Sequence, residues 1–149
     1  MIIGIDPGMS GGIASVRDYK MEAHRCPQTA LEMASLFRKL ISKPDSLKVY
    51  VENVHAFPTD ARSSAFKFGR NFGMWLGIIG TFGIEPYLVS PMKWQKHYGQ
   101  LPKIKKERKQ MLKQMASDLV IEPFTLKGRI TLSTADAILI ARYGTEQCD

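Results

Sequence analysis

The chain has 149 residues, 44% of them hydrophobic and 23% charged, which is typical of a soluble globular protein and unlike a disordered or fibrous one. We expect a single domain over residues 1–149, because a chain of this length buries about 68–70% of its unfolded surface. Twenty-one basic against fourteen acidic residues give a formal charge of +7, so a polyanion such as nucleic acid is the first partner to consider.

The cysteines and the apolar segments indicate in which cellular compartment the protein lies. Cys26 and Cys148 are too few and too far apart for a disulfide framework or a zinc site. The sequence has neither the pattern of a signal peptide nor an apolar stretch that is long and unbroken enough to span a bilayer. We therefore expect a cytoplasmic protein without a membrane partner.

In the first third of the chain, the hydrophobic pattern predicts two strands, a helix and a further strand. Residues 2–6 have the pattern of a buried strand, and residues 11–18 that of its hairpin partner. Apolar spacing predicts a helix from Thr29 to Leu40. Residues 47–54, rich in β-branched side chains, predict a second central strand.

The remainder predicts three helices and one short strand. Residues 63–83 form a helix candidate with Ser63 or Ser64 as its cap, and residues 86–91 a short strand. A basic amphipathic helix follows over residues 103–120. The last helix covers residues 133–144, capped by Ser133 or Thr134, with Gly144 past its end. Strands followed by crossover helices predict an α/β fold.

Three acidic residues occupy similar positions in this plan. Asp6 and Glu52 end predicted strands, and Asp136 starts the last helix. If these ends are neighbours, the carboxylates converge and can hold Mg²⁺, which prefers oxygen ligands. Two such ions could activate water against a phosphodiester. Simpler interpretations stay open: Asp136 complements the helix dipole, Glu52 lies on a solvent-facing strand edge, and Asp6 only opens a turn.

Six ordered segments resemble the RuvC-type Holliday junction resolvases of the ribonuclease H-like superfamily. The segments are GIDPGMSGG, VENVHAF, SSAFKFGRNFG, VSPMKWQKHYG, KKERKQMLKQMA and STADAILIARYG. The resemblance implies an α/β, ribonuclease H-like fold with a mixed five-stranded sheet flanked by helices. It also implies metal-dependent cleavage of four-way or other branched DNA by a homodimer, with Mg²⁺ as cofactor and Mn²⁺ able to replace it. By position, Asp6, Glu52 and Asp136 match the metal-binding catalytic carboxylates.

Ser133 departs from the family pattern. Cellular members carry a fourth ligand at this position, one helical turn before the closing aspartate, and a hydroxyl is a poorer Mg²⁺ ligand than a carboxylate. Since residues three apart share a helix face, Ser133 and Asp136 would point to one pocket if the helix begins near Ser133. The departure suggests a phage-type or divergent member. It also leaves open which group completes the second metal site.

Basic residues crowd the predicted helix over residues 103–120, at a density suited to phosphate contacts. A solvated helix face is the alternative. The resemblance makes Lys106 the catalytic or phosphate-binding lysine, and it places His55 where the family has an aromatic residue that wedges into the junction, with Phe57 nearby. Phe57 could equally be a core residue. The full set of DNA-binding candidates is Lys67, Lys93, Lys96, Lys103, Lys105, Lys106, Arg108, Lys109, Lys113, His55 and Phe57.

Glycines at positions 69, 73 and 77 recur every four residues on the predicted central helix. They form either a dimer seam or a stripe that packs closely on the chain's own sheet.

Three functions compete: a junction endonuclease, a junction-binding module that cuts weakly or not at all, and a phosphate-handling ATPase lobe. The last rests only on the loose likeness of DPGMSG to a phosphate-wrapping loop. Such enzymes use two lobes, and this chain has the signature of one.

Overall fold

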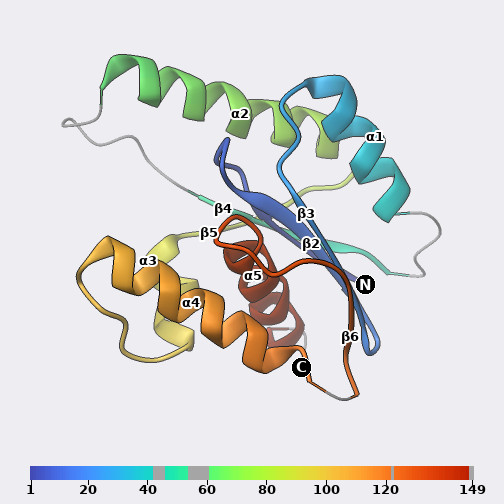
Figure 1. The fold of residues 1–149 in the computed structure, drawn as a ribbon. Coiled ribbons are helices and arrows are strands. Elements are labelled where there is room, and N and C mark those ends of the chain that lie inside the picture. The colour runs from blue at the N-terminus through green and yellow to red at the C-terminus, as the bar shows by residue number, and fades with distance from the viewer. Residues whose placement is uncertain (42–45, 54–60, 122, 148–149) are drawn as a thin grey trace.

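The computed structural model of the chain describes residues 1–41, 46–53, 61–121 and 123–147 (Figure 1). The strands are β1 (Ile2–Asp6), β2 (Gly12–Arg17), β3 (Lys20–Arg25), β4 (Lys48–Glu52), β5 (Tyr87–Val89) and β6 (Thr125–Gly128). The helices are α1 (Ala30–Leu40), α2 (Arg62–Thr81), α3 (Pro91–His97), α4 (Lys105–Leu119) and α5 (Ala135–Glu146). No helix in these ranges is long and apolar enough to cross a lipid bilayer.

The strands form one mixed sheet in the order β5-β4-β1-β2-β3-β6. β2 pairs antiparallel with both β1 and β3, whereas the pairs β1–β4, β4–β5 and β3–β6 are parallel. The predicted α/β class with a mixed sheet is confirmed. The expected number of five strands was wrong, because the short β6 pairs with β3 and adds a sixth. The sequence of β6, TLKG, is half polar and largely exposed, so it carries no apolar strand pattern.

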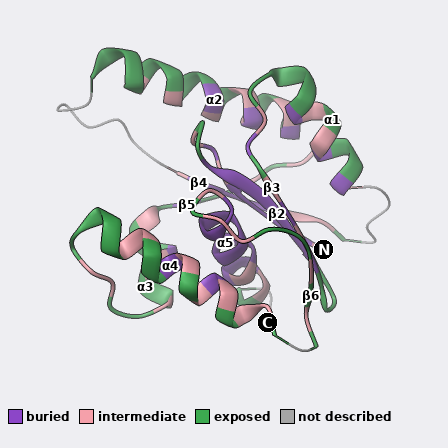
Figure 2. Cartoon of the chain, in the orientation of Figure 1, coloured by how far each residue is buried: buried purple, intermediate pink, exposed green. Residues whose placement is uncertain are grey.

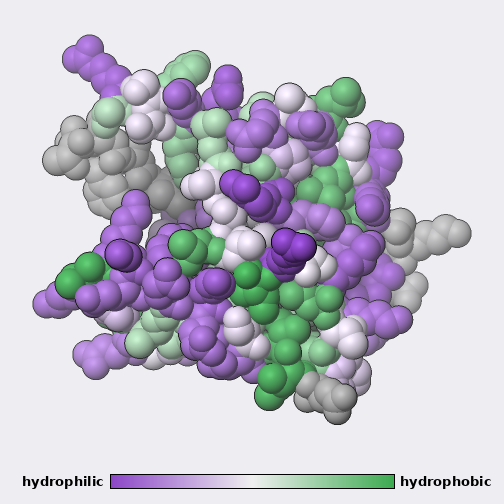
Figure 3. All heavy atoms as spheres, viewed as in Figure 1, coloured by the Kyte–Doolittle hydropathy of each residue, from purple (hydrophilic) through white to green (hydrophobic). Residues whose placement is uncertain are grey.

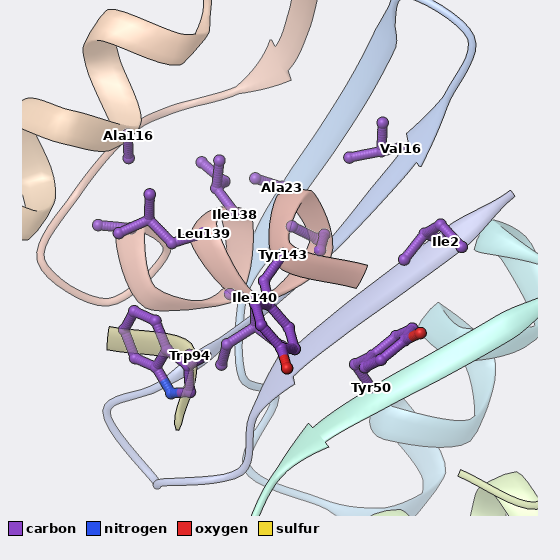
Figure 4. Packing of buried hydrophobic residues seen from close by; sticks show 14 of the residues in the cluster. Ile2, Val16, Ala23, Tyr50, Trp94, Ala116, Ile138, Leu139, Ile140 and Tyr143 are labelled. Atoms are coloured by element: carbon purple, nitrogen blue, oxygen red, sulfur yellow. The ribbon is translucent and has the colours of Figure 1, made fainter. Parts of the chain in front are cut away.

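Helices cover both faces of the sheet (Figure 1). On one face, α1 and α2 pack over apolar side chains of β1, β2 and β4, with Phe37 and Trp75 fully buried among them. On the other face α5 lies against the sheet, and α3 and α4 lie outside it. Figure 4 shows side chains of α5 meeting Trp94 of α3 and Ala116 of α4. The end of α5 that carries Asp136 is therefore held between the sheet and α4.

Two glycines bring α5 into direct contact with the sheet. A Cβ on Gly4 of β1 would lie 2.3 Å from the backbone nitrogen of Ala141 and 2.4 Å from the carbonyl oxygen of Ala137. A Cβ on Gly144 would lie 2.6 Å from the ring of Tyr50 on β4. The prediction that Gly144 follows the end of the helix was wrong: α5 continues to Glu146, and the glycine provides room for the tyrosine.

Several local predictions differ from the structure. β3 and α3 had no prediction, and α2 begins after Ala61, without a side-chain cap at Ser63 or Ser64. α3 forms because Ser90 accepts a hydrogen bond from the Lys93 backbone (3.3 Å) and a proline follows it at the first helical position. This short helix is what carries Trp94 under the sheet.

Candidate metal centre

Asp6 ends the central strand β1, and a tight loop folds back over its side chain. The Gly8 backbone N–H donates to Asp6 Oδ1 at 3.1 Å, which forms the turn expected of an aspartate in this position. A Cβ on Gly11 would lie 2.3 Å from the Asp6 carbonyl oxygen and 2.6 Å from its carboxyl carbon. A glycine at position 11 therefore lets the loop close on the carboxylate.

Glu52 ends the neighbouring parallel strand β4 and is 7% exposed. The interpretation of Glu52 as a solvent-facing edge residue was wrong. The indole N–H of Trp94, a fully buried residue of α3, donates to Glu52 Oε1 at 2.9 Å. β1 and β4 are adjacent and parallel, so their carboxyl ends bring Asp6 and Glu52 to one edge of the sheet.

Asp136 lies in the first turn of α5 and is 3% exposed. Its Oδ2 atom forms an ion pair with the half-buried ammonium group of Lys109 on α4. Its Oδ1 atom is buried and has no hydrogen-bond partner among the residues that the structure describes. A buried, unpartnered carboxylate oxygen is costly unless a cation or donor reaches it.

The carboxylates perturb one another. Burial, and then the negative charge of Asp136, raise the pKa of Asp6. Burial, and then the charge of Asp6, raise the pKa of Glu52 to about 8. For Lys109 burial acts in the opposite direction, but the contact with Asp136 outweighs it and raises the pKa. The three acids thus share one electrostatic environment in which positive charge is in deficit.

The donor set suits a hard cation, although the side chains do not yet converge. In the described parts of the chain, no three His, Cys, Asp or Glu side chains are arranged to hold one metal ion as they stand. Asp6, Glu52 and Asp136 each have one oxygen held by a protein donor, namely Gly8, Trp94 and Lys109. The second oxygen of each has no partner among the described residues. Mg²⁺ prefers carboxylate oxygens as ligands, so these three oxygens, Asp136 Oδ1 among them, are suited to bind it.

Lys109 is the basic residue that the structure brings to the carboxylates. Lys106, for which the resemblance implies the catalytic role, is exposed one turn earlier on α4, and that role stays a prediction. Hydrophilic side chains gather over α4 (Figure 3). The other candidates on or near this helix are exposed or half-buried, and they are Lys93, Lys96, Lys103, Lys105, Arg108 and Lys113. Lys67 lies apart, exposed on α2.

Three further predicted residues are His55, Phe57 and Ser133. His55 and Phe57 lie outside the residues that the structure describes. Ser133 is half-buried in the turn before α5, not on the helix, so the premise that it shares a helix face with Asp136 was wrong. The cause is the Thr131 hydroxyl, which accepts from the backbone N–H groups of Ser133 and Thr134 (3.2 Å each) and delays the helix start.

Trp94 and Asn71 support the site and had no sequence prediction. Asn71, a buried residue of α2, donates its amide to the Pro7 carbonyl oxygen and to Cys26 Sγ (3.3 Å), which ties α2 to the loop beside Asp6. Neither residue carries a charge or a metal-ligand spacing. For Asn71 the available signal was a polar side chain within the apolar pattern of the predicted helix over residues 63–83, whereas Trp94 lies on a helix that had no prediction.

Solved structures resemble this arrangement over nearly all of the chain. A structure of Thermus thermophilus RuvC in complex with a Holliday junction substrate superposes with a TM-score of 0.62 at 18% identity, covering 99% of this chain and 93% of that one. A second T. thermophilus RuvC structure gives a TM-score of 0.59 at 19% identity, covering 99% and 96%. No protein-family model and no curated protein matches the sequence. The chain therefore has a RuvC-like fold.

Proposed function

We propose that this protein is a metal-dependent endodeoxyribonuclease that resolves four-way or other branched DNA junctions. The observation that carries the proposal is the grouping of Asp6, half-buried, with the buried Glu52 and Asp136 in a RuvC-like fold, with one Asp136 oxygen unpartnered among the described residues. A buried excess of carboxylates destabilises a protein unless it serves to hold a cation.

Asp6, Glu52 and Asp136 would hold Mg²⁺, or Mn²⁺ in its place. When bound, the ion supplies a nucleophilic water and neutralises charge on the phosphodiester. Gly8 and Trp94 fix the orientation of Asp6 and Glu52 through hydrogen bonds of 3.1 and 2.9 Å. Lys109 neutralises part of the negative charge and is placed to contact a phosphate oxygen that approaches Asp136.

Branched DNA fits the charge distribution around these carboxylates. Lysines of α4 are exposed on the same helix whose Lys109 reaches Asp136, so phosphate groups bound along α4 would lead a strand toward the acids. The T. thermophilus neighbour is described as a complex with a Holliday junction substrate, which supports the same class of partner.

A homodimer is part of this proposal. The close packing of the α2 glycines on their own sheet was a wrong alternative: a Cβ added at Gly69, Gly73 or Gly77 would meet no atom within 4 Å. Figure 2 shows the buried residues of α2 on the side toward the sheet. Beside this stripe Phe66 is 71% exposed. A second copy packed on the stripe would present two sites to two symmetric strands.

The direct test incubates labelled four-way, three-way and linear duplex DNA with the protein, with Mg²⁺ or with EDTA. We expect paired nicks in the four-way junction only with Mg²⁺. Asp6→Asn should abolish nicking and leave junction binding in EDTA intact or tighter, because the amide keeps the shape and removes a negative charge.

The matched control is Asp18→Asn, which neutralises an exposed aspartate in the β2–β3 turn. Its φ of 52° suits asparagine as well as aspartate, so cutting should be unchanged. Nicking by Asp6→Asn at the wild-type rate, or by the wild type in EDTA, would contradict the proposal. Junction binding with no Mg²⁺-dependent cutting would instead support the second candidate, a binding module.

A further inference from the structure

A polar cavity lies on the sheet, away from the carboxylates. It has a volume of about 400 Å³ and is lined by the outer ends of β2 and β3, by β6 and by the C-terminal end of α1. We term this cavity the β2–β3 groove. Its polar lining residues are Ser15, Arg17, Lys20, Glu22, Lys39, Thr125 and Lys127.

The strand register explains why these side chains share one face. Ser15 pairs with Glu22, and Glu22 with Lys127, in one row across β2, β3 and β6. Arg17 pairs with Lys20 in the next row that faces the same way, because side chains alternate along a strand. The row of Ser15 begins with Ile3, which lies in the core beneath α1 and α2. The groove is thus the polar continuation of a face whose other half is apolar.

Charge in the groove is strongly unbalanced. Even without Lys39, three cationic side chains of the described lining stand against one carboxylate, a surplus of two positive charges. That carboxylate is already engaged, since Glu22 Oε1 lies 2.7 Å from His24 Nε2 and 3.1 Å from Lys127 Nζ. Arg17 and Lys20 face a cavity whose described lining holds no second acid.

Ser15 provides an independent observation. It is 8% exposed at the wall of the groove, and its hydroxyl has no hydrogen-bond partner among the described residues. The hydroxyl is not sealed off from the cavity, so it can donate to an acceptor that enters the groove from outside the chain.

The groove is separate from the proposed metal centre. Asp6 pairs with Gly12, and Arg17 lies five residues further along β2, which is about 17 Å at the usual rise per strand residue. A ligand in the groove therefore does not contact the carboxylate cluster, and this inference goes beyond the proposed junction cleavage.

We propose that the β2–β3 groove binds a phosphate ester of about the size of a mononucleotide. A phosphate group offers three acceptor oxygens, which match the Arg17 guanidinium, the Lys20 ammonium and the Ser15 hydroxyl. The apolar side chain of Leu40 on α1 lines the same cavity and would face the sugar or base. The volume lies within the range of about 300–1,000 Å³ for small-molecule sites.

The test is calorimetric titration in EDTA, so that no step depends on a bound metal. The probes are deoxythymidine 5′-monophosphate, inorganic pyrophosphate and a single-stranded oligonucleotide of eight deoxythymidines. We expect one monophosphate to bind per chain, and Arg17→Ala with Lys20→Ala to weaken it by about tenfold or more, since two charge-assisted contacts are lost. Ser15→Asp should abolish binding by placing a carboxylate in the cavity.

The matched control is Arg25→Ala with Arg38→Ala. This pair removes two positive charges from exposed residues that do not line the groove, so affinity should stay within about twofold because no direct contact with the ligand is lost. Tighter binding of the oligonucleotide than of the monophosphate, lost in the groove variants alone, would identify a nucleic-acid strand as the source of the phosphate. Equal weakening in both double variants, or no one-to-one binding of any probe to the wild type, would overturn the proposal. Neither result bears on junction cutting in Mg²⁺.

Discussion

Trp94 and Trp75 are both fully buried, and each donates its indole N–H to a different kind of acceptor. Trp94 donates to the Glu52 carboxylate at 2.9 Å, whereas Trp75 donates to the sulfur of Cys26 at 3.3 Å. The two residues therefore form a matched pair for measuring what the bond to Glu52 contributes.

Replacing either tryptophan by phenylalanine removes the donor and part of the ring. At pH 9, where Glu52 is largely ionised, Trp94→Phe should destabilise the protein by about 1–3 kcal/mol more than Trp75→Phe, because it leaves a buried carboxylate oxygen without its donor. Urea unfolding followed by circular dichroism measures both. Equal losses for the two variants would mean that the indole does not support Glu52.

Stability without metal should depend on pH through Glu52. Its pKa is about 4.5 in the unfolded chain and about 8 in the folded one, where burial and then the charge of Asp6 raise it. Between these values the folded state holds more protons, so the free energy of unfolding in EDTA should fall as pH rises from about 4.5 to 8. Glu52→Gln should flatten this slope in urea titrations at pH 5, 6, 7 and 8. A wild-type slope that is unchanged by the substitution would contradict the assignment.

At the scale of elements, α4 combines two roles along its length. Lys105 and Lys106 are exposed in its first turn, and Lys109 reaches Asp136 one turn later. Leu112 and Ala116 are buried and anchor the helix on α5. These contacts set the rotation of the helix about its axis.

Removing the exposed pair should affect DNA affinity without affecting the carboxylates. For Lys105→Ala with Lys106→Ala, the slope of log affinity against log salt should become shallower by about 0.9 for each lost phosphate contact on duplex DNA. Fluorescence anisotropy with a labelled junction between low and moderate salt measures the slope. The pair Arg25→Ala and Arg38→Ala serves as control, and an equal change in its slope would place the DNA elsewhere.

The sequence predicted those elements whose patterns are locally complete. β1, β4 and α5 carry apolar runs that only a buried element explains, and their acidic ends followed from them. β3 and β6 contain many polar residues because one face of each strand is exposed to solvent. Such short strands form only when they pair with a neighbouring strand, so their own sequences do not predict them. Lys109 could not be separated from Lys106 because the choice depends on how Leu112 and Ala116 seat the helix, which is a tertiary contact.

For the whole molecule, the exposed glycine stripe of α2 predicts a test of assembly. Gly73→Leu adds a side chain where nothing lies within 4 Å in one chain, so it should leave the fold intact or stabilise α2. If a second copy packs on the stripe, the variant should sediment as a monomer at concentrations where the wild type is a dimer. Ser35→Leu, which adds the same side chain to an exposed position of α1, is the control. A wild type that stays monomeric at every concentration would contradict the seam.

The close packing of α5 on β1 has a consequence for the nascent chain during synthesis. Gly4 admits the backbone of α5 against β1, and Asp136 reaches Asp6 only after that contact forms. At a synthesis rate of about 5–20 residues per second, the 130 residues between positions 6 and 136 take about 7–26 seconds to emerge. During that interval the nascent protein exposes α1 and the first strands but no complete set of carboxylates. The proposed nuclease would therefore be inert on the ribosome and would become active only when the last helix docks.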